Sequence, residues 1–173
     1  TNINIVAGNT LNAGGANTFS VLGFWDNSGT FTPQTGTVAF IATSSSKTIN
    51  QASSNFYNTT FNGVGGAWRW LNTNATTTND LTVATGTLTF PGGTLEVGGS
   101  FANTGGTFLH NSGITKLIAT AGGKTVQVGT STFNDLTFNG AGGAWSFIDT
   151  NATTSGTLTI LAGTPTFPSG VLE

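Results

Sequence analysis

Apolar and polar residues alternate along this chain in short runs, and glycine, asparagine or proline separates one run from the next. Clear examples are LTVATGTLTF from Leu81, KTVQV from Lys124 and LTI from Leu158. Period-two alternation of this kind predicts short, half-buried strands of about three to six residues. Apolar residues do not recur at the spacing of an amphipathic helix. We therefore expect an all-β protein whose strands are joined by tight corners.

The pattern itself repeats along the chain. The phrase FNGVGGAWRWLNTNATT at Phe61 returns as FNGAGGAWSFIDTNATT at Phe138, inside a 43-residue match with 25 identities and no gap. The stretch Phe24–Ser53 matches Phe101–Thr130 at 10 positions, again without a gap. The chain is therefore predicted to form one continuous repeat domain, 1–173, with a first unit 1–77, a second unit 78–154 and a partial third unit 155–173.

Each 77-residue unit holds roughly ten to twelve strand-sized segments. Surface loops usually tolerate insertions, so a repeat that keeps its length throughout indicates turns that must stack on one another. We predict a parallel β-solenoid, or β-helix, with about four coils per unit and a rise of roughly 4.8 Å per coil. Tandem antiparallel β-sandwich domains are the alternative, but their strands usually run to about five or six residues or longer.

Two stretches carry a family resemblance, FNDLTFNGAGGAWSFIDTNATTSGTLTI and GTLTFPGGTLEVGGSFANTGGTF. They resemble repeats of large bacterial secreted and surface proteins of the filamentous-haemagglutinin and autotransporter-passenger type. The resemblance lies in rhythm and composition and covers nearly the whole chain. It implies a parallel β-solenoid with an extracellular structural or adhesive role, and it transfers no functional residue.

The repeated phrase contains aromatic residues at alternating positions, which places them on one side of a strand. We expect this side to face inward, because aromatic residues of this size bury roughly 150–250 Å² each. An outward orientation would instead make a stacking platform for sugars. The predicted aromatic ladder comprises Phe61, Trp68, Trp70, Phe138, Trp145 and Phe147.

The amino-acid composition argues against nucleic-acid binding and against a membrane-spanning segment. Only 6% of the residues are charged, and the four basic residues are scattered, so no nucleic-acid footprint is expected. The chain contains no apolar run of about 18 residues, so we predict no membrane-spanning helix. Cysteine and methionine are both absent, which fits an exposed, oxidising setting outside the cell. The chain is expected to follow a removed leader or to be part of a longer protein.

Candidate chemistry is sparse. Of the six carboxylates only Glu96 recurs one unit later, as Glu173, and the single histidine, His110, has no neighbouring ligand types. We therefore expect no catalytic residues, metal or cofactor, and we read the carboxylates as solvated surface groups. Asn74 and Asn151 are equivalent N-x-Thr sequons and candidate glycosylation sites.

The sequence favours a non-enzymatic structural segment of an extracellular fibre, filament or surface adhesin, with further copies of the same repeat as its partner. A carbohydrate-binding adhesin module, with glycans or a host surface as partner, is the alternative. Thr-x-Thr runs, as at Thr85 to Thr89, leave an ice-binding solenoid as a minor alternative.

Overall fold

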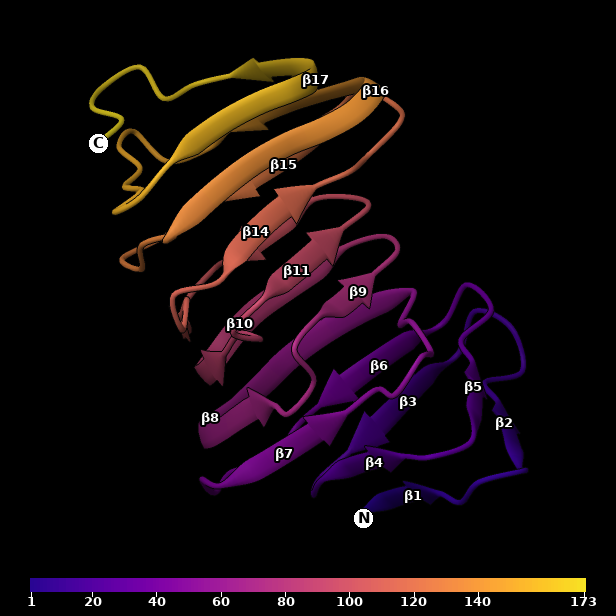
Figure 1. The fold of residues 1–173 in the computed structure, drawn as a ribbon. Coiled ribbons are helices and arrows are strands. Elements are labelled where there is room, and N and C mark those ends of the chain that lie inside the picture. Colours follow the sequence, from indigo (N-terminus) through magenta and orange to yellow (C-terminus); the bar gives the residue numbers. More distant parts are fainter.

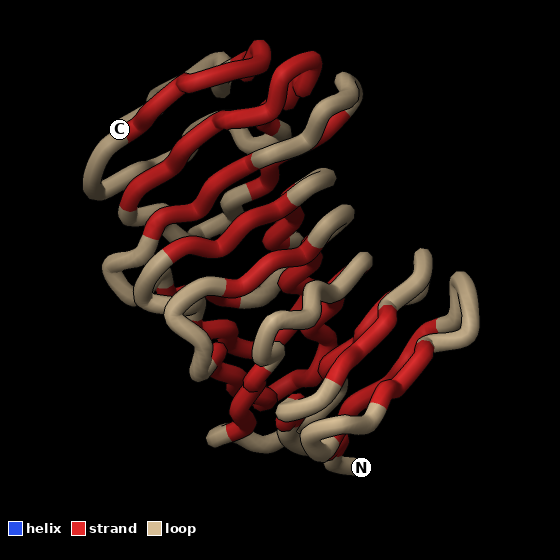
Figure 2. The backbone as a smooth tube through the Cα atoms, turned by 45° about the vertical axis from the view of Figure 1, so that its right-hand side comes forward, coloured by secondary structure: helices blue, strands red, loops and turns tan.

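The structure, a computed structural model, describes all 173 residues, and every regular element in it is a β-strand. The strands stack coil upon coil along one axis, from the N-terminus at one end to the C-terminus at the other (Figures 1 and 2). The result is an all-β parallel β-solenoid of about eight turns, as the sequence predicted. The antiparallel sandwich alternative is wrong, because every strand pairing is parallel. No helix capable of crossing a membrane is present.

Each turn contributes three strand positions, so the solenoid has three faces, numbered in the order in which the chain visits them. The first face comprises β1 (Ile3–Ile5), β4 (Trp25–Asn27), β7 (Lys47–Asn50), the second halves of β8 (Asn58–Trp70) and β10 (Leu81–Thr89), and β13 (Thr107–Leu109).

The second and third faces are built in the same way. The second face comprises β2 (Thr10–Asn12), β5 (Thr30–Thr32), β9 (Ala75–Thr77), β11 (Thr94–Val97), β14 (Ile114–Leu117) and the first halves of β16 (Asp135–Phe147) and β17 (Leu158–Thr166). The third face comprises β3 (Thr18–Val21), β6 (Thr37–Phe40), the first halves of β8 and β10, β12 (Phe101–Asn103), β15 (Lys124–Gln127) and the second halves of β16 and β17.

Four strands are longer than the sequence predicted. β8 and β16 have 13 residues each, and β10 and β17 have 9 each. Each of them continues around a corner from one face to the next, and the ladder of β8 with β10 shifts register at the bend. Glycine allows this: Gly65 and Gly142 sit at the bends of β8 and β16 with φ of 78° and 83°. The glycine clusters that predicted strand ends therefore mark bends within strands.

The 77-residue unit does not correspond to a whole number of turns. From β1 to its counterpart, the first half of β10, there are eleven strand positions, with β8 counted as two and the isolated bridge at Phe56 as one. At three positions per turn, one unit makes three and two-thirds turns. The second unit is therefore rotated by one face: the first half of β8 lies on the third face, and its counterpart in β16 lies on the second.

One stretch of the ungapped alignment is wrong at residue level. Trp25 pairs with Ile49, and Phe101 pairs with Val126, which is the counterpart of Ile49. Phe101 therefore corresponds to Trp25 and not to Phe24, whose side chain is 38% exposed. The corner after β4 is one residue shorter than the corner after β12, and it absorbs the slip.

A single apolar core runs the length of the solenoid. It contains 30 buried residues drawn from all three faces, and it passes without interruption through the junction between the two units. Because each coil covers the core residues of the coil before it, the interior is a stack of side-chain layers rather than two separate cores.

Candidate functional site

The repeated phrase places its aromatic side chains in this interior. Trp68 and Trp145 are each 1% exposed, and Phe61 and Phe138 are fully buried. Phe61 and Trp68 have ring centroids 5.3 Å apart at 59°, and Phe138 and Trp145 repeat this geometry at 5.2 Å and 62°. Neither tryptophan is accessible as a stacking platform for a sugar.

The last members of the two phrases differ in burial. Trp70 is 3% exposed and packs edge-on against Phe61, with ring centroids 5.5 Å apart. Phe147 is partly buried, and its ring lies 6.3 Å from that of Phe138 and 5.7 Å from that of Phe167. The position thus accepts either a tryptophan or a phenylalanine in contact with the core.

The glycines of the phrase make room for the tryptophan ring. A Cβ on Gly66 would lie 2.2 Å from the carbonyl oxygen of Ala42 and 2.5 Å from the Trp68 ring. A Cβ on Gly143 would meet Ala119 at 2.1 Å and Trp145 at 2.5 Å. The two copies of the phrase therefore pack in the same way. In each, a bent strand lies against the previous coil with the tryptophan ring beneath the bend.

Two partly buried polar clusters, which the sequence reasoning missed, join successive coils by hydrogen bonds. The Ser54 hydroxyl oxygen accepts hydrogen bonds from the Asn27 side-chain amide at 3.1 Å and from the Phe31 backbone amide at 2.9 Å. One unit later, Ser131 accepts from Asn103 at 3.2 Å and from Phe108 at 3.0 Å. Ser54 and Ser131 are identical residues at equivalent positions of the two units, so the alignment already contained this signal.

Several carboxylates act as structural acceptors rather than as freely solvated groups. Asp80 accepts from the Ser100 backbone amide at 2.7 Å, and Asp135 accepts from that of Thr157 at 2.6 Å. Asp149 accepts from the backbone amides of two residues in the preceding coil, Val128 and Gly129. The expectation of a purely solvated role is corrected for these three residues, because each oxygen satisfies backbone groups at a corner.

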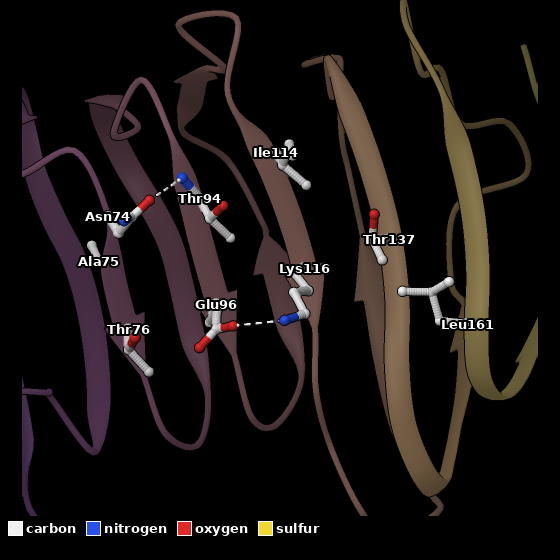
Figure 3. Close-up of a pocket in the computed structure, with 9 residues that line it drawn as sticks. All are labelled: Asn74, Ala75, Thr76, Thr94, Glu96, Ile114, Lys116, Thr137 and Leu161. Atoms are coloured by element: carbon white, nitrogen blue, oxygen red, sulfur yellow. Dashed lines mark hydrogen bonds and ion pairs between the residues drawn. The ribbon is translucent and has the colours of Figure 1, made fainter.

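An open groove of about 470 Å³ runs across the outer side of the second face (Figure 3). Lys116 and Glu96 form an ion pair of 3.0 Å at its centre, with side chains 28% and 33% exposed. Because the two charges neutralise each other, the groove presents hydroxyl and amide groups together with three apolar side chains. The lining residues are Asn74, Ala75, Thr76, Thr94, Glu96, Ile114, Lys116, Thr137 and Leu161.

The two candidate glycosylation sites hold the same structural position in their units. The Asn74 side-chain oxygen accepts from the Thr94 backbone amide, and that of Asn151 accepts from Val171, both at 2.8 Å. Both asparagines are exposed, and their side-chain nitrogens make no hydrogen bond. Because of the rotation between units, Asn74 lies at the start of a strand on the second face, and Asn151 lies on the first.

The outward threonines do not form an unbroken row. Along the second face the register places Thr76, Glu96, Lys116, Thr137 and Thr159 side by side, so the ion pair interrupts the threonines.

His110 accepts a hydrogen bond at Nδ1 from the Ser112 backbone amide at 3.0 Å. No group of three or more His, Cys, Asp or Glu side chains is placed to hold a metal ion.

Comparison of the chain with protein families, with curated proteins and with solved structures gives no match.

Proposed function

We propose that this chain is a structural segment of an extracellular fibre, filament or adhesin, and that it acts by rigid extension of a stacked solenoid. The observation that carries the proposal is the uninterrupted core. Thirty buried residues form one cluster across the unit junction, so adding a unit lengthens the rod without introducing a hinge.

The polar groups fit a structural role. The oxygens of Asp80, Asp135 and Asp149 cap backbone amides, and Glu96 is paired with Lys116. These groups serve coil-to-coil cohesion, which supports a non-enzymatic role. Assembly would occur end to end, with the strands of a terminal coil pairing with those of another copy.

Rigid extension is tested by inserting one further copy of residues 78–154 after residue 154. The extended protein and the original chain are then compared by small-angle X-ray scattering. Three and two-thirds turns at roughly 4.8 Å each predict an increase of about 18 Å in the longest dimension. A scattering profile of two flexibly linked bodies would contradict the proposal.

Assembly and location need separate measurements. Electron microscopy of the purified chain should show filaments, and antibodies against the chain should label intact source cells. Isolated short rods at high protein concentration would exclude end-to-end assembly, and labelling only after permeabilisation would exclude an extracellular position.

A further inference from the structure

The C-terminal end of the solenoid leaves part of the apolar core uncovered. β17 is the last strand of the stack and pairs only with β16 (Figure 1). Ile160 is the register partner of the fully buried Phe138, so its side chain points inward, yet it is 50% exposed. Phe167 and Leu172 pack against the core from the same coil and are only partly buried. Elsewhere in the molecule the following coil covers such side chains.

The N-terminal end is open on the opposite side of the stack. β1, β2 and β3 each pair along one edge only, with β4, β5 and β6. The inward side chains Ile3, Leu11 and Phe19 are partly buried, and they border a depression of about 470 Å³. No charged residue lines this depression, so an apolar layer can cover it without burying a charge.

Main-chain hydrogen bonds give the two ends complementary edges. Inward residues donate their N–H to the following coil, as Leu136 does to the carbonyl of Thr157. Outward residues donate to the preceding coil, as Thr37 does to Asn17. The C-terminal end therefore presents the edge that a following coil needs, and the N-terminal end presents the edge that a preceding coil needs. Two identical ends would pair their strands antiparallel, unlike every ladder in the chain.

The number of strand positions determines how one copy would lie on the next. The chain has 25 positions when β8, β10, β16 and β17 count as two each and the isolated bridges at Phe56, Phe133, Ala152 and Leu172 count as one each. At three positions per turn this makes eight and one-third turns. The last position, at Leu172, lies on the first face, so the next coil begins on the second face, over the first half of β17.

We propose that a second copy of this chain stacks head-to-tail on the first and is rotated by one face. Its β1 lies on the first half of β17, its β2 on the second half, and its β3 on the position of Leu172. The proposal rests on the end-to-end assembly proposed above and adds the register and the rotation. A contact between two different ends does not close on itself, so it continues into a filament.

In this register the core continues across the junction. Ile3 and Ile5 of the second copy lie over Leu158 and Ile160 of the first, and all four point inward. Asn4 of the second copy donates its N–H to the carbonyl of Leu158 and accepts from the N–H of Ile160, by the hydrogen-bond pattern of the internal ladders. The junction thus buries the side chains that the isolated ends leave uncovered.

The junction is weaker than an internal coil boundary. Pro165 holds the inward position beside Trp145 in the second half of β17, and it has no N–H to donate to the following coil. Assembly should therefore depend on protein concentration. Eight and one-third turns at roughly 4.8 Å predict an axial rise of about 40 Å per copy, and every third copy returns to the same face.

Disulfide formation tests the rotation, because the chain contains no cysteine of its own. A Thr159→Cys chain is mixed with an Asn4→Cys chain and oxidised gently. Thr159 is the outward partner of Thr137, and Asn4 lies between two inward isoleucines, so the proposal places their Cα atoms about 4.8 Å apart. This distance permits a disulfide, and we expect a covalent heterodimer.

The two other rotations supply matched controls. They would place Asn12 on β2 or Ser20 on β3 beside Thr159, so each is replaced by cysteine in turn and mixed with the Thr159→Cys chain. Both mixtures should give at least about tenfold less heterodimer than the Asn4→Cys mixture.

A second test places a charge at the junction without a cysteine. Ile160→Lys should raise the protein concentration needed for assembly, measured by sedimentation, at least about tenfold, because the lysine would be buried without a partner. Leu161→Lys is the matched control, since Leu161 lines the outer groove (Figure 3), and it should leave that concentration unchanged. Circular dichroism checks that both variants remain folded.

The outcomes separate this inference from the proposed function. Equal crosslinking at Asn12 or Ser20, a filament rise other than about 40 Å, or undiminished assembly of Ile160→Lys would overturn the register and leave end-to-end assembly standing. A chain that stays monomeric in every mixture and at high concentration would overturn both.

Discussion

Truncation of Trp68 to alanine tests whether the repeated phrase stabilises the fold through its core. The side chain is 1% exposed and contacts the ring of Phe61. A buried tryptophan removes roughly 150–250 Å² from water, which at about 25 cal/mol per Å² corresponds to roughly 4–6 kcal/mol. Tryptophan-to-alanine changes in protein cores cost about 3–5 kcal/mol. We expect Trp68→Ala to lower the free energy of unfolding by about 4 kcal/mol.

The measurement is urea denaturation followed by far-ultraviolet circular dichroism, because the remaining tryptophans complicate a fluorescence signal. Trp145→Ala is the matched variant and should lose a similar amount, since burial and ring geometry are the same in both copies. Trp68→Phe should cost less than about 1.5 kcal/mol, because it keeps an aromatic ring and removes an indole N–H that has no partner. A folded Trp68→Ala protein that loses less than about 1 kcal/mol would refute the packing argument.

Three further substitutions and one control have expected effects on the urea midpoint. Gly66→Ala should destabilise by about 3 kcal/mol through contact with the Ala42 carbonyl, whereas Gly122→Ala, whose Cβ would meet nothing closer than 3.5 Å, should be neutral. Ser54→Ala should cost about 1–3 kcal/mol because it leaves the buried amide of Asn27 without one of its acceptors; an unchanged midpoint would show that water replaces the hydroxyl. Lys116→Ala should cost less than about 1 kcal/mol, since the ion pair is solvent-exposed, and a larger loss would assign the ion pair a role in folding.

The solenoid was predictable because its determinants are local and repeated. Alternation predicted the strands, and the constant length of the unit predicted the stacking. The lengths of β8 and β16 were not predictable in the same way, because a glycine-rich segment reads equally as a loop between two strands or as a bend within one. The choice depends on whether the corner backbone pairs with the neighbouring coil, which is a tertiary interaction.

The placement of the surface charges was less accessible to sequence reasoning. Lys47 and Arg69 belong to separate runs of the sequence, and by position alone they count as scattered charges. In the structure Arg69 is the register partner of Thr48, whereas Lys47 lies beside the buried Trp68. A comparison of the two units at each position shows that Ser146 replaces Arg69, but only the register shows that Arg69 lies beside Thr48.

The mismatch between the 77-residue unit and the turn has a physical explanation. A strand in this fold stacks on the strands three positions before and after it, so its environment depends on that spacing and not on which face it occupies. A shift of eleven positions moves a strand and both of its stacking partners together, so the strand pairing around it is preserved although the face changes. Such a shift requires that a strand can pack the same inward side chains against the core from any of the three faces. The Phe61–Trp68 and Phe138–Trp145 pairs, with nearly identical geometry beneath different corners, meet that requirement. The fold therefore depends on the fit of each strand to its stacking partners, and the repeat unit need not be a whole number of turns.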